Sequence, residues 1–349
     1  MIGSSTALVA IGLLSIYSSS IGRQDFTNFQ KQAIFLAIGL FLMLVISFLD
    51  YRLLRNNPYL LLFLYFIGVV ALGGLLIFVQ EIRGIHGWYR IGVISVDPIE
   101  FMKIVLVLVM AKFFSYRHVE VYRIRHILLA GVYFAIPTIL IVMQPDVGSA
   151  ILLIALWLIT LLVAGIKFRH FFAIVVIGLL VFLAAWTFAL QDYQKNRIIS
   201  FLEPEFDPLG IGWSQLQSKI AIGNGGVFGQ GLGDGTQTQY GFLSEPQTDF
   251  IFAAIAEEFG LVLVLVMFLL LFILLWRILK IGIDAASNFS RLFAAGLVTI
   301  FITQIGINIG MNLGLLPIIG LPLPLVSYGG SSLIMTFIGL GILQSIKTH

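Results

Sequence analysis

The sequence contains no cysteine and little charge. Among its 349 residues 11% are Asp, Glu, Lys or Arg, and without Cys there can be no disulfide, thiolate nucleophile or cysteine metal site. Five histidines are scattered without a ligand spacing such as HExxH, which argues against a histidine metal site. Hydrophobic residues make up 59% of the chain, and the mean hydropathy is +1.04. This composition predicts a polytopic membrane protein.

Ten apolar runs are long enough to cross a bilayer, because a hydrocarbon core of about 30 Å needs about 20 helical residues. The predicted spans are residues 2–21, 32–49, 58–79, 99–114, 126–143, 147–165, 170–190, 250–276, 291–313 and 326–346. They predict an all-α polytopic membrane protein with about ten transmembrane helices. Residues 1–349 form a single integral membrane domain, and residues 191–249 form a long loop between helices 7 and 8.

The basic residues indicate the orientation of these spans. With both termini on one side, that side holds twelve of the twenty basic residues. They are Arg52, Arg55, Lys112, Arg117, Arg123, Arg125, Lys167, Arg169, Arg277, Lys280, Arg291 and Lys347. Because short basic loops stay in the cytoplasm, we expect both termini there and the 191–249 loop to be extracytoplasmic. This preference of basic residues for the cytoplasmic side already explains where they lie in the sequence, so no nucleic-acid partner is expected.

Acidic residues interrupt the apolar pattern at the eighth span. Asp249 stands where the long loop turns into the span, in the segment LSEPQTDFIFAAIAEEFG (residues 243–260). Because placing a charge in hydrocarbon costs at least about 2.5–3.5 kcal/mol, such an acid is a functional-site hypothesis. Glu257 and Glu258 lie deeper and on different helix faces, so at most one can face the same cavity as Asp249. The other is expected to cap or pair within the bundle.

Further polar residues fall on the same predicted membrane face. Glu100 and Lys103 are one helical turn apart and can pair. Asp146 lies in a QPD turn, and Arg197 is at the start of the long loop. With Asp249, three carboxylates and two cations can therefore converge. For Glu100 and Lys103 the alternative is an ion pair that only holds helix ends together.

Two irregular segments accompany these residues. The glycine-rich tract at residues 223–235 follows no strand, which argues against a dinucleotide site and favours a bent re-entrant or surface loop. Its glycines allow close approach of the backbone to a ligand or a neighbouring helix, or serve only as flexible turns. Pro317, Pro322 and Pro324 forbid a continuous helix over residues 314–325. Irregular backbone at membrane depth must be buried in protein or line a cavity.

The ninth predicted span carries a stripe of amide side chains at i, i+4 and i+8. These are Gln304, Asn308 and Asn312. We expect these side chains to make hydrogen bonds between helices rather than to line a transport path, because such bonds are common where membrane helices pack together.

Four long motifs give the chain a family resemblance. They are QPDVGSA, QSKIAIGNGGVFGQGLGDGTQTQ, SEPQTDFIFAAIAEEFG and LPLPLVSYGGSS, beginning at residues 144, 217, 244 and 321. In order and spacing they resemble the SEDS family of shape, elongation, division and sporulation proteins, and the GTQTQ stretch is more similar to its rod-shape branch. The resemblance implies a ten-span peptidoglycan glycosyltransferase. Such an enzyme polymerises lipid II on the outer face of the bacterial cytoplasmic (inner) membrane during cell elongation and shape maintenance.

The resemblance also implies roles for residues. Asp249 falls on the essential aspartate of the family, as the catalytic candidate. The substrate-binding or supporting candidates are Glu100, Lys103, Asp146, Arg197, Lys219 and Ser327. The implied partners are lipid II, membrane lipid and a class B penicillin-binding protein. Two departures are Gln247, where the family often has histidine, and the DPIEF motif at residues 97–101, where it often has QPSEF.

The chemistry of the implied substrate needs few groups. A lipid pyrophosphate leaves readily, so one base is sufficient, in contrast to the two carboxylates of glycoside hydrolysis. Asp249 is the expected base, with Arg197, Lys103 or a divalent cation (Mg²⁺ or Mn²⁺) near the pyrophosphate. The alternatives are a flippase or other transporter of the lipid-linked precursor and a scaffold for wall enzymes. Transporters usually contain repeated halves, and we find no internal repeat.

Overall fold

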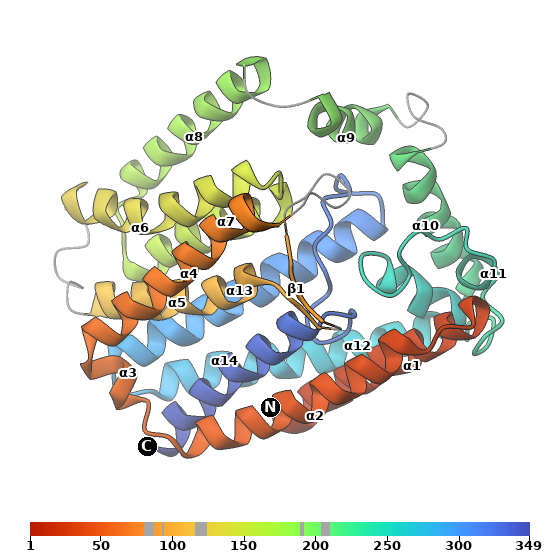
Figure 1. The fold of residues 1–349 in the computed structure, drawn as a ribbon, viewed down its shortest axis with the longest axis horizontal. Helices are drawn as coiled ribbons and strands as arrows, with labels where there is room; N and C mark the ends of the chain where they lie inside the picture. Colours follow the sequence, from red (N-terminus) through yellow and green to blue (C-terminus); the bar gives the residue numbers. More distant parts are fainter. Residues whose placement is uncertain (80–86, 93, 116–123, 189–191, 204–209) are drawn as a thin grey trace.

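The computed structural model is a bundle of long helices that run lengthwise through the molecule (Figure 1). It describes residues 1–79, 87–92, 94–115, 124–188, 192–203 and 210–349. Its helices are α1 (Ile2–Arg23), α2 (Thr27–Phe48), α3 (Arg52–Asn56), α4 (Pro58–Phe78), α5 (Pro98–Ser115), α6 (Ile124–Met143), α7 (Val147–Ala164), α8 (Phe168–Phe188), α9 (Asp192–Leu202), α10 (Ile211–Gly225), α11 (Thr236–Gln239), α12 (Ile251–Asp284), α13 (Asn288–Asn312) and α14 (Gly330–Thr348). The strands are β1 (Tyr89–Ile91) and β2 (Ile94–Val96).

The predicted spans are confirmed as helices. Within the described ranges, nine helices are long and apolar enough to cross a membrane: α1, α2, α4, α6, α7, α8, α12, α13 and α14. The remaining predicted span is α5, whose 18 residues include the charged Glu100, Lys103 and Lys112. Two of the twelve basic residues used for the orientation, Arg117 and Arg123, lie outside the described residues.

Helix α5 forms the centre of the bundle. It contacts α4, α6, α7, α13 and α14, and it is buried along most of its length, with Met102 and Leu106 fully enclosed. Because protein surrounds this helix, its charged side chains are kept from lipid, where an ionised group is costly. A charged span can therefore lie in the interior.

Local sequence signals fix several helix starts. Asn57 accepts a hydrogen bond from the Leu60 amide, and Pro58 occupies the first turn of α4. Asp146 caps α7 in the same way through the Ser149 amide at 3.0 Å. These caps satisfy amides that have no partner inside the helix.

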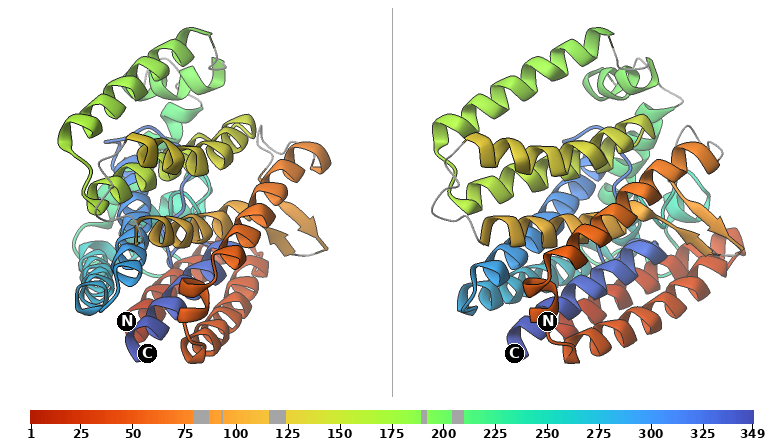
Figure 2. Two further views of the ribbon diagram at one scale, coloured as in Figure 1. Left: turned by 90° about the vertical axis from the view of Figure 1, so that its left-hand side faces the viewer. Right: turned by 60° about the vertical axis from the view of Figure 1, so that its left-hand side comes forward.

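The two ends of the bundle differ. We call one the hairpin end, because it holds the antiparallel hairpin β1–β2 together with α10 and α11, close to the end of α1 and the start of α12 (Figures 1 and 2). The opposite termini end holds Met1 and Lys347, which line one hollow. The all-α prediction missed the hairpin, whose strands of three residues flank Gly92 at φ 62°.

The predicted long loop over residues 191–249 contains three helices, α9, α10 and α11. Gln191 and residues 204–209 lie outside the described part of the chain. Helix α8, which precedes the loop, has no buried residue, and Figures 1 and 2 show α8 and α9 at the edge of the molecule. Within this segment, α10 contacts both α12 and α13, and α11 contacts α12.

Helix α12 is broken at Gly260, which has φ 68° and ψ −170°. The glycine-rich tract packs into this break: the amide of Leu261 donates to Gly226 O at 3.0 Å, and the amide of Gln230 donates to Glu257 O at 2.9 Å. A Cβ atom on Gly260 would be 2.3 Å from Gly229 N. The close approach predicted for the tract is confirmed, and its neighbour is a helix.

Candidate active site

Asp249 lies in the turn that leads into α12. The two residues just before it, Gln247 and Thr248, are held in place by hydrogen bonds that their carbonyl oxygens accept. Gln247 O accepts from the Tyr328 amide at 2.8 Å. Thr248 O accepts from Ser327 Oγ at 2.7 Å, and Ser327 Oγ also accepts from the Leu323 amide at 2.8 Å. The hydroxyl of Ser327, a predicted supporting residue, thus holds the turn and the segment between α13 and α14 together.

The carbonyl oxygen of Asp249 is held by the amide stripe of α13. It accepts from Asn308 Nδ2 at 3.1 Å and from Asn312 Nδ2 at 2.9 Å. Asn312 Oδ1 also accepts from the Ala253 amide at 3.2 Å, in the first turn of α12. Asn308 and Asn312 of the stripe therefore make hydrogen bonds between elements, as predicted, and three consecutive carbonyl groups before α12 are anchored.

The side chain of Gln247 links the turn to the first two helices. Its Oε1 accepts from Asn28 Nδ2 at 2.7 Å, and its Nε2 donates to Ser19 Oγ at 3.0 Å and Ser20 Oγ at 3.3 Å. An amide can donate and accept at once, as this position requires. Gln247, which stands where the family often has histidine, thus connects the turn before α12 to α1 and α2 through its side-chain hydrogen bonds.

The carboxylate of Asp249 faces Gly320 in the irregular segment between α13 and α14. A Cβ atom on Gly320 would lie 3.6 Å from Asp249 Oδ2, and Gly320 has φ 72°, a conformation that favours glycine. Asp249 is half-buried. The predicted break of the helix by three prolines is confirmed, and the resulting backbone borders the candidate base.

A second polar group occupies the start of α5. Lys103 Nζ and Glu100 Oε2 are 2.6 Å apart, and both side chains are largely buried. Asp97 precedes the helix, where its Oδ1 accepts from the Ile99 amide at 2.9 Å and its own amide donates to Ser331 Oγ at 3.0 Å. This group thus contacts the start of α14.

The acids at this end act on one another. Burial raises the pKa of Asp97 to about 8, and the negative charges of Glu100 and Asp146 add to the rise, while the Ile99 amide and Lys103 oppose it. Burial also raises the pKa of Asp146, against the hydrogen bonds from Ser149 and the charges of Lys103 and Arg197. Two predicted acids and both predicted cations therefore share one electrostatic environment.

The segment between α13 and α14 joins this group to Asp249. At the start of α7, two residues after Asp146, a Cβ atom on Gly148 would be 2.6 Å from Ile319 O. The next residue along the chain, Gly320, borders the Asp249 carboxylate. One short stretch of backbone thus touches the surroundings of both acids.

Lys219 is placed apart from this group. It is exposed on α10, and a Cβ atom on Gly314 would meet its Cε, so the side chain lies over the end of α13. Its neighbour Ser218 donates to Asn312 O at 2.9 Å. The neighbour of Lys219 thus contacts Asn312, which donates to the Asp249 carbonyl.

Glu257 and Glu258 make hydrogen bonds within the bundle, as the sequence predicted for at least one of them. Glu257 accepts from the amides of Gln237 at 2.7 Å and Thr238 at 3.0 Å, at the start of α11. Glu258 Oε1 accepts from Ser18 Oγ at 2.7 Å and from Gln239 Nε2 at 2.8 Å. Both glutamates tie α12 to its neighbours.

Asp97 is the residue that sequence reasoning missed. The sequence shows it only as a departure within the DPIEF motif, although an acid directly before a helix start is the usual signal of a cap.

No three His, Asp or Glu side chains within the described ranges are arranged to hold a metal ion. We therefore assign no residue set to the divalent cation considered above.

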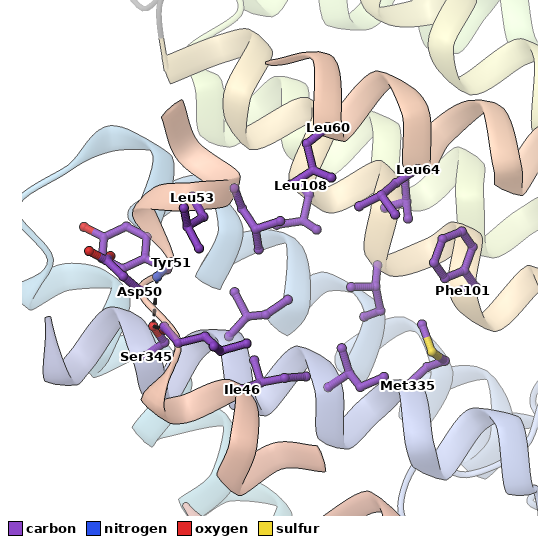
Figure 3. Close-up of a pocket in the computed structure, with 16 residues that line it drawn as sticks. Ile46, Asp50, Tyr51, Leu53, Leu60, Leu64, Phe101, Leu108, Met335 and Ser345 are labelled. Atoms are coloured by element: carbon purple, nitrogen blue, oxygen red, sulfur yellow. Dashed lines mark hydrogen bonds between the residues drawn. The ribbon is translucent and has the colours of Figure 1, made fainter. Parts of the chain in front are cut away.

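An apolar cavity of about 350 Å³ lies between α2, α3, α4, α5 and α14 (Figure 3). Leu60, Leu64, Leu108 and Met335 are among its walls, and its polar residues, Asp50, Tyr51 and Ser345, are at the termini end. None of the candidate site residues lines it. Most of its walls are aliphatic and offer room for hydrocarbon, so the acids of the hairpin end remain the candidate site.

The fold and the site define a polytopic helical membrane protein with anchored acids and cations at one end of its bundle. The chain belongs to the family of FtsW, RodA and SpoVE, whose model, described as "Cell cycle protein", matches residues 1–349. This finding confirms the resemblance to the SEDS family.

Several relatives align over almost the whole chain. The peptidoglycan glycosyltransferase MrdB of Escherichia coli (strain K12) is 39% identical over 344 residues, covering 98% of this chain and 91% of the relative. The peptidoglycan glycosyltransferase RodA of Treponema pallidum (strain Nichols) is 31% identical, covering 98% and 95%. Stage V sporulation protein E of Bacillus subtilis (strain 168) is 35% identical, covering 98% and 94%.

Solved structures share the fold. One is a chain from work described as "Structural coordination of polymerization and crosslinking by a peptidoglycan synthase complex", with a TM-score of 0.85 and 29% identity. That match covers 99% of this chain and 96% of the other. The rod shape determining protein RodA of Thermus thermophilus has a TM-score of 0.74 and 27% identity, covering 99% and 95%.

Proposed function

We propose that this protein is a peptidoglycan glycosyltransferase that polymerises lipid II into glycan strands at the hairpin end of its bundle, with Asp249 as general base. The relatives named peptidoglycan glycosyltransferases align over nearly all of the chain and support the activity. The observation that supports the site most strongly is the anchoring of Asp249. Side chains of α13 hold its carbonyl group while its carboxylate faces Gly320. A base must be held in position to be effective.

In the proposed step, the Asp249 carboxylate accepts the proton of a sugar hydroxyl on the acceptor. The hydroxyl oxygen forms a bond to the anomeric carbon of the donor sugar as the bond from that carbon to the pyrophosphate oxygen breaks. The electron pair of the broken bond leaves with the lipid pyrophosphate. No acid is needed to protonate this leaving group, so a single carboxylate is sufficient.

The cations of the site are proposed to stabilise the departing phosphates. Lys103 and Arg197 both act on Asp146, so they share the environment of the acids at this end. Lys103 is held by Glu100 at 2.6 Å, which keeps the ammonium group in place before the substrate arrives. Fixed charges in a poorly solvated site stabilise developing charge more strongly than mobile charges in water.

A divalent cation, Mg²⁺ or Mn²⁺, is not assigned to protein ligands here, because no group of three His, Asp or Glu side chains is placed to hold one within the described residues. Mg²⁺ is commonly held by one or two carboxylates together with substrate phosphates and water, so it would arrive with lipid II. Rates with added Mg²⁺, with Mn²⁺ and with a chelator test this point. A chelator that stops polymerisation would add an ion to the proposed site.

The proposed orientation puts both termini in the cytoplasm and the hairpin end outside the cytoplasmic membrane. Met1 and Lys347 lie at one end of the bundle, which supports a common side for the termini, and Arg277 and Lys280 are at that end too. By family resemblance, the partner is a class B penicillin-binding protein. The similarity to a chain of a synthase complex that coordinates polymerization and crosslinking supports a partner of this kind.

The experiment that separates this function from transport uses purified protein with labelled lipid II in detergent, where no membrane sides exist. Polymer formed without another synthase is the expected result. Monomer alone in detergent, together with movement of lipid II across vesicle membranes, would instead establish a transporter.

A further inference from the structure

A basic hollow of about 590 Å³ lies at the termini end, opposite the candidate active site. The starts of α1 and the ends of α12 and α14 form it. Its charged lining residues are Arg277, Lys280 and Asp284 of α12 and Lys347 of α14. Three cations and one acid give a net side-chain charge of +2 around one hollow.

The cations converge from two helices. Arg277, Lys280 and Asp284 are spaced i, i+3 and i+7, so they share one face of α12. The pKa of the Met1 amino group is lowered first by burial and then by the positive charges of Arg277 and Lys347. Positive charges from α12 and α14 therefore both act on the Met1 amino group.

Among the described residues, Arg277, Lys280 and Lys347 have no partner. In the part of the chain that the structure describes, none of them makes a hydrogen bond or an ion pair. Two other cations at the termini end do have partners: Arg52 pairs with Asp50 at 4.0 Å, and Arg291 donates to Ala285 O at 3.1 Å. Unpaired like charges gathered at one place favour binding of an anion.

Apolar side chains also line the hollow. Ile2, Ile281 and Ile346 are among its lining residues, together with the charged side chains. Cations and apolar side chains that line one hollow at the end of membrane helices match a phospholipid, with its phosphate at the cations and its acyl chains along the helices. A free phosphate ion would use the cations alone.

We propose that this hollow binds the headgroup of an anionic phospholipid. The proposal is independent of the glycosyltransferase reaction, since no residue of the active site takes part. It assigns Arg277, Lys280 and Lys347 to the lipid phosphate, and the three isoleucines to the first part of its acyl chains.

The test measures binding of phosphatidylglycerol to the purified full-length protein in detergent, with phosphatidylcholine and inorganic phosphate as comparison ligands. The test variant is Arg277→Gln, Lys280→Gln and Lys347→Gln combined. The matched control is Arg125→Gln, Lys167→Gln and Arg169→Gln, which removes the same charge at the same end, near α6 and α8. Thermal unfolding of each variant shows that it is folded.

We expect phosphatidylglycerol to bind the parent and the control variant alike, and the test variant at least about tenfold more weakly, because each cation near an anionic lipid contributes to binding. Phosphatidylcholine should bind more weakly to the parent. Equal binding of phosphatidylglycerol to parent and test variant, or equal loss in the control, would overturn the proposal. Stabilisation by inorganic phosphate equal to that by the lipid would overturn the assignment to a phospholipid.

Discussion

At the scale of single residues, Asn308 and Asn312 show how polar side chains of a membrane helix can hold the backbone of a candidate site. Both donate to the carbonyl oxygen of Asp249, and Asn312 accepts from the Ala253 amide. A buried carbonyl left without a donor costs about 1–3 kcal/mol. These asparagines therefore fix the backbone from which the proposed base projects.

We expect Asn312→Ala to lower the polymerisation rate about tenfold or more, because the Asp249 carbonyl and the Ala253 amide both lose a partner. Initial rates with labelled lipid II, normalised to folded protein, measure the effect. The matched control is Gln304→Ala, about two turns earlier in the same stripe, whose Nε2 has no partner within the described residues. A rate equal to that of the control would refute the positioning role.

Asp97 predicts a pH dependence of stability. Its pKa is about 8 in the folded protein and 3.8 in its ordinary state, so between these values the folded protein binds more protons than the unfolded chain. Stability must then fall as the pH rises through this window, by at most about 1.4 kcal/mol per pH unit from this group. Above about pH 8 the loss is complete.

We expect the melting temperature of the parent protein in detergent to fall between pH 5 and pH 8, with buffers of equal ionic strength, as follows from the raised pKa of Asp97. Asp97→Asn removes the titrating group and should flatten this dependence. An equally steep dependence in Asp97→Asn would show that another group is responsible.

At the scale of elements, the helices could be predicted better than their irregularities. Apolar runs placed most spans to within a few residues, because length and hydropathy suffice for a membrane helix, although α12 extends eight residues beyond its predicted end and α2 starts five residues before its predicted start. The break of α12 at Gly260 could not be predicted, because it depends on packing of the 223–235 tract against it. The hydrogen bonds to the Asp249 carbonyl could not be predicted for a similar reason, because their donors, Asn308 and Asn312, are 59 and 63 positions away in sequence.

The break predicts a position that does not tolerate a side chain. Gly260→Ala places a Cβ atom 2.3 Å from Gly229 N and forces alanine into φ 68°, so we expect a loss of about 3 kcal/mol or more. Thermal unfolding in detergent measures it. Gly178→Ala on α8 is the control, because nothing lies within 4 Å of the added atom and the change should be neutral or slightly stabilising. Similar melting temperatures for both variants would contradict this account of the break.

At the scale of the whole molecule, the sequence predicted which polar residues share one end but not how they are joined. Lys103 pairs with Glu100, and the charges of Lys103 and Arg197 act on Asp146, as their positions at span ends suggested. The backbone at residues 319–320, which touches the surroundings of both Asp146 and Asp249, carries no charged residue to indicate this role. Links through backbone are visible only in the fold.

The absence of cysteine permits a direct test of sidedness with single cysteines and no background. Tyr240→Cys marks the hairpin end and Asn56→Cys the termini end, and both positions are exposed. In intact spheroplasts a membrane-impermeant maleimide should label Tyr240→Cys alone, and disruption should expose Asn56→Cys. The reverse pattern would invert the proposed orientation and remove the active site from the outer face.

The central claim is that the Asp249 carboxylate takes the proton in glycan polymerisation. The most direct measurement compares parent, Asp249→Asn and the exposed Asp234→Asn in purified form with labelled lipid II. Loss of a general base lowers a rate by about 10²–10⁴-fold, so Asp249→Asn should fall at least about a hundredfold while Asp234→Asn keeps the parental rate. A folded Asp249→Asn protein that polymerises lipid II at the parental rate would contradict the account.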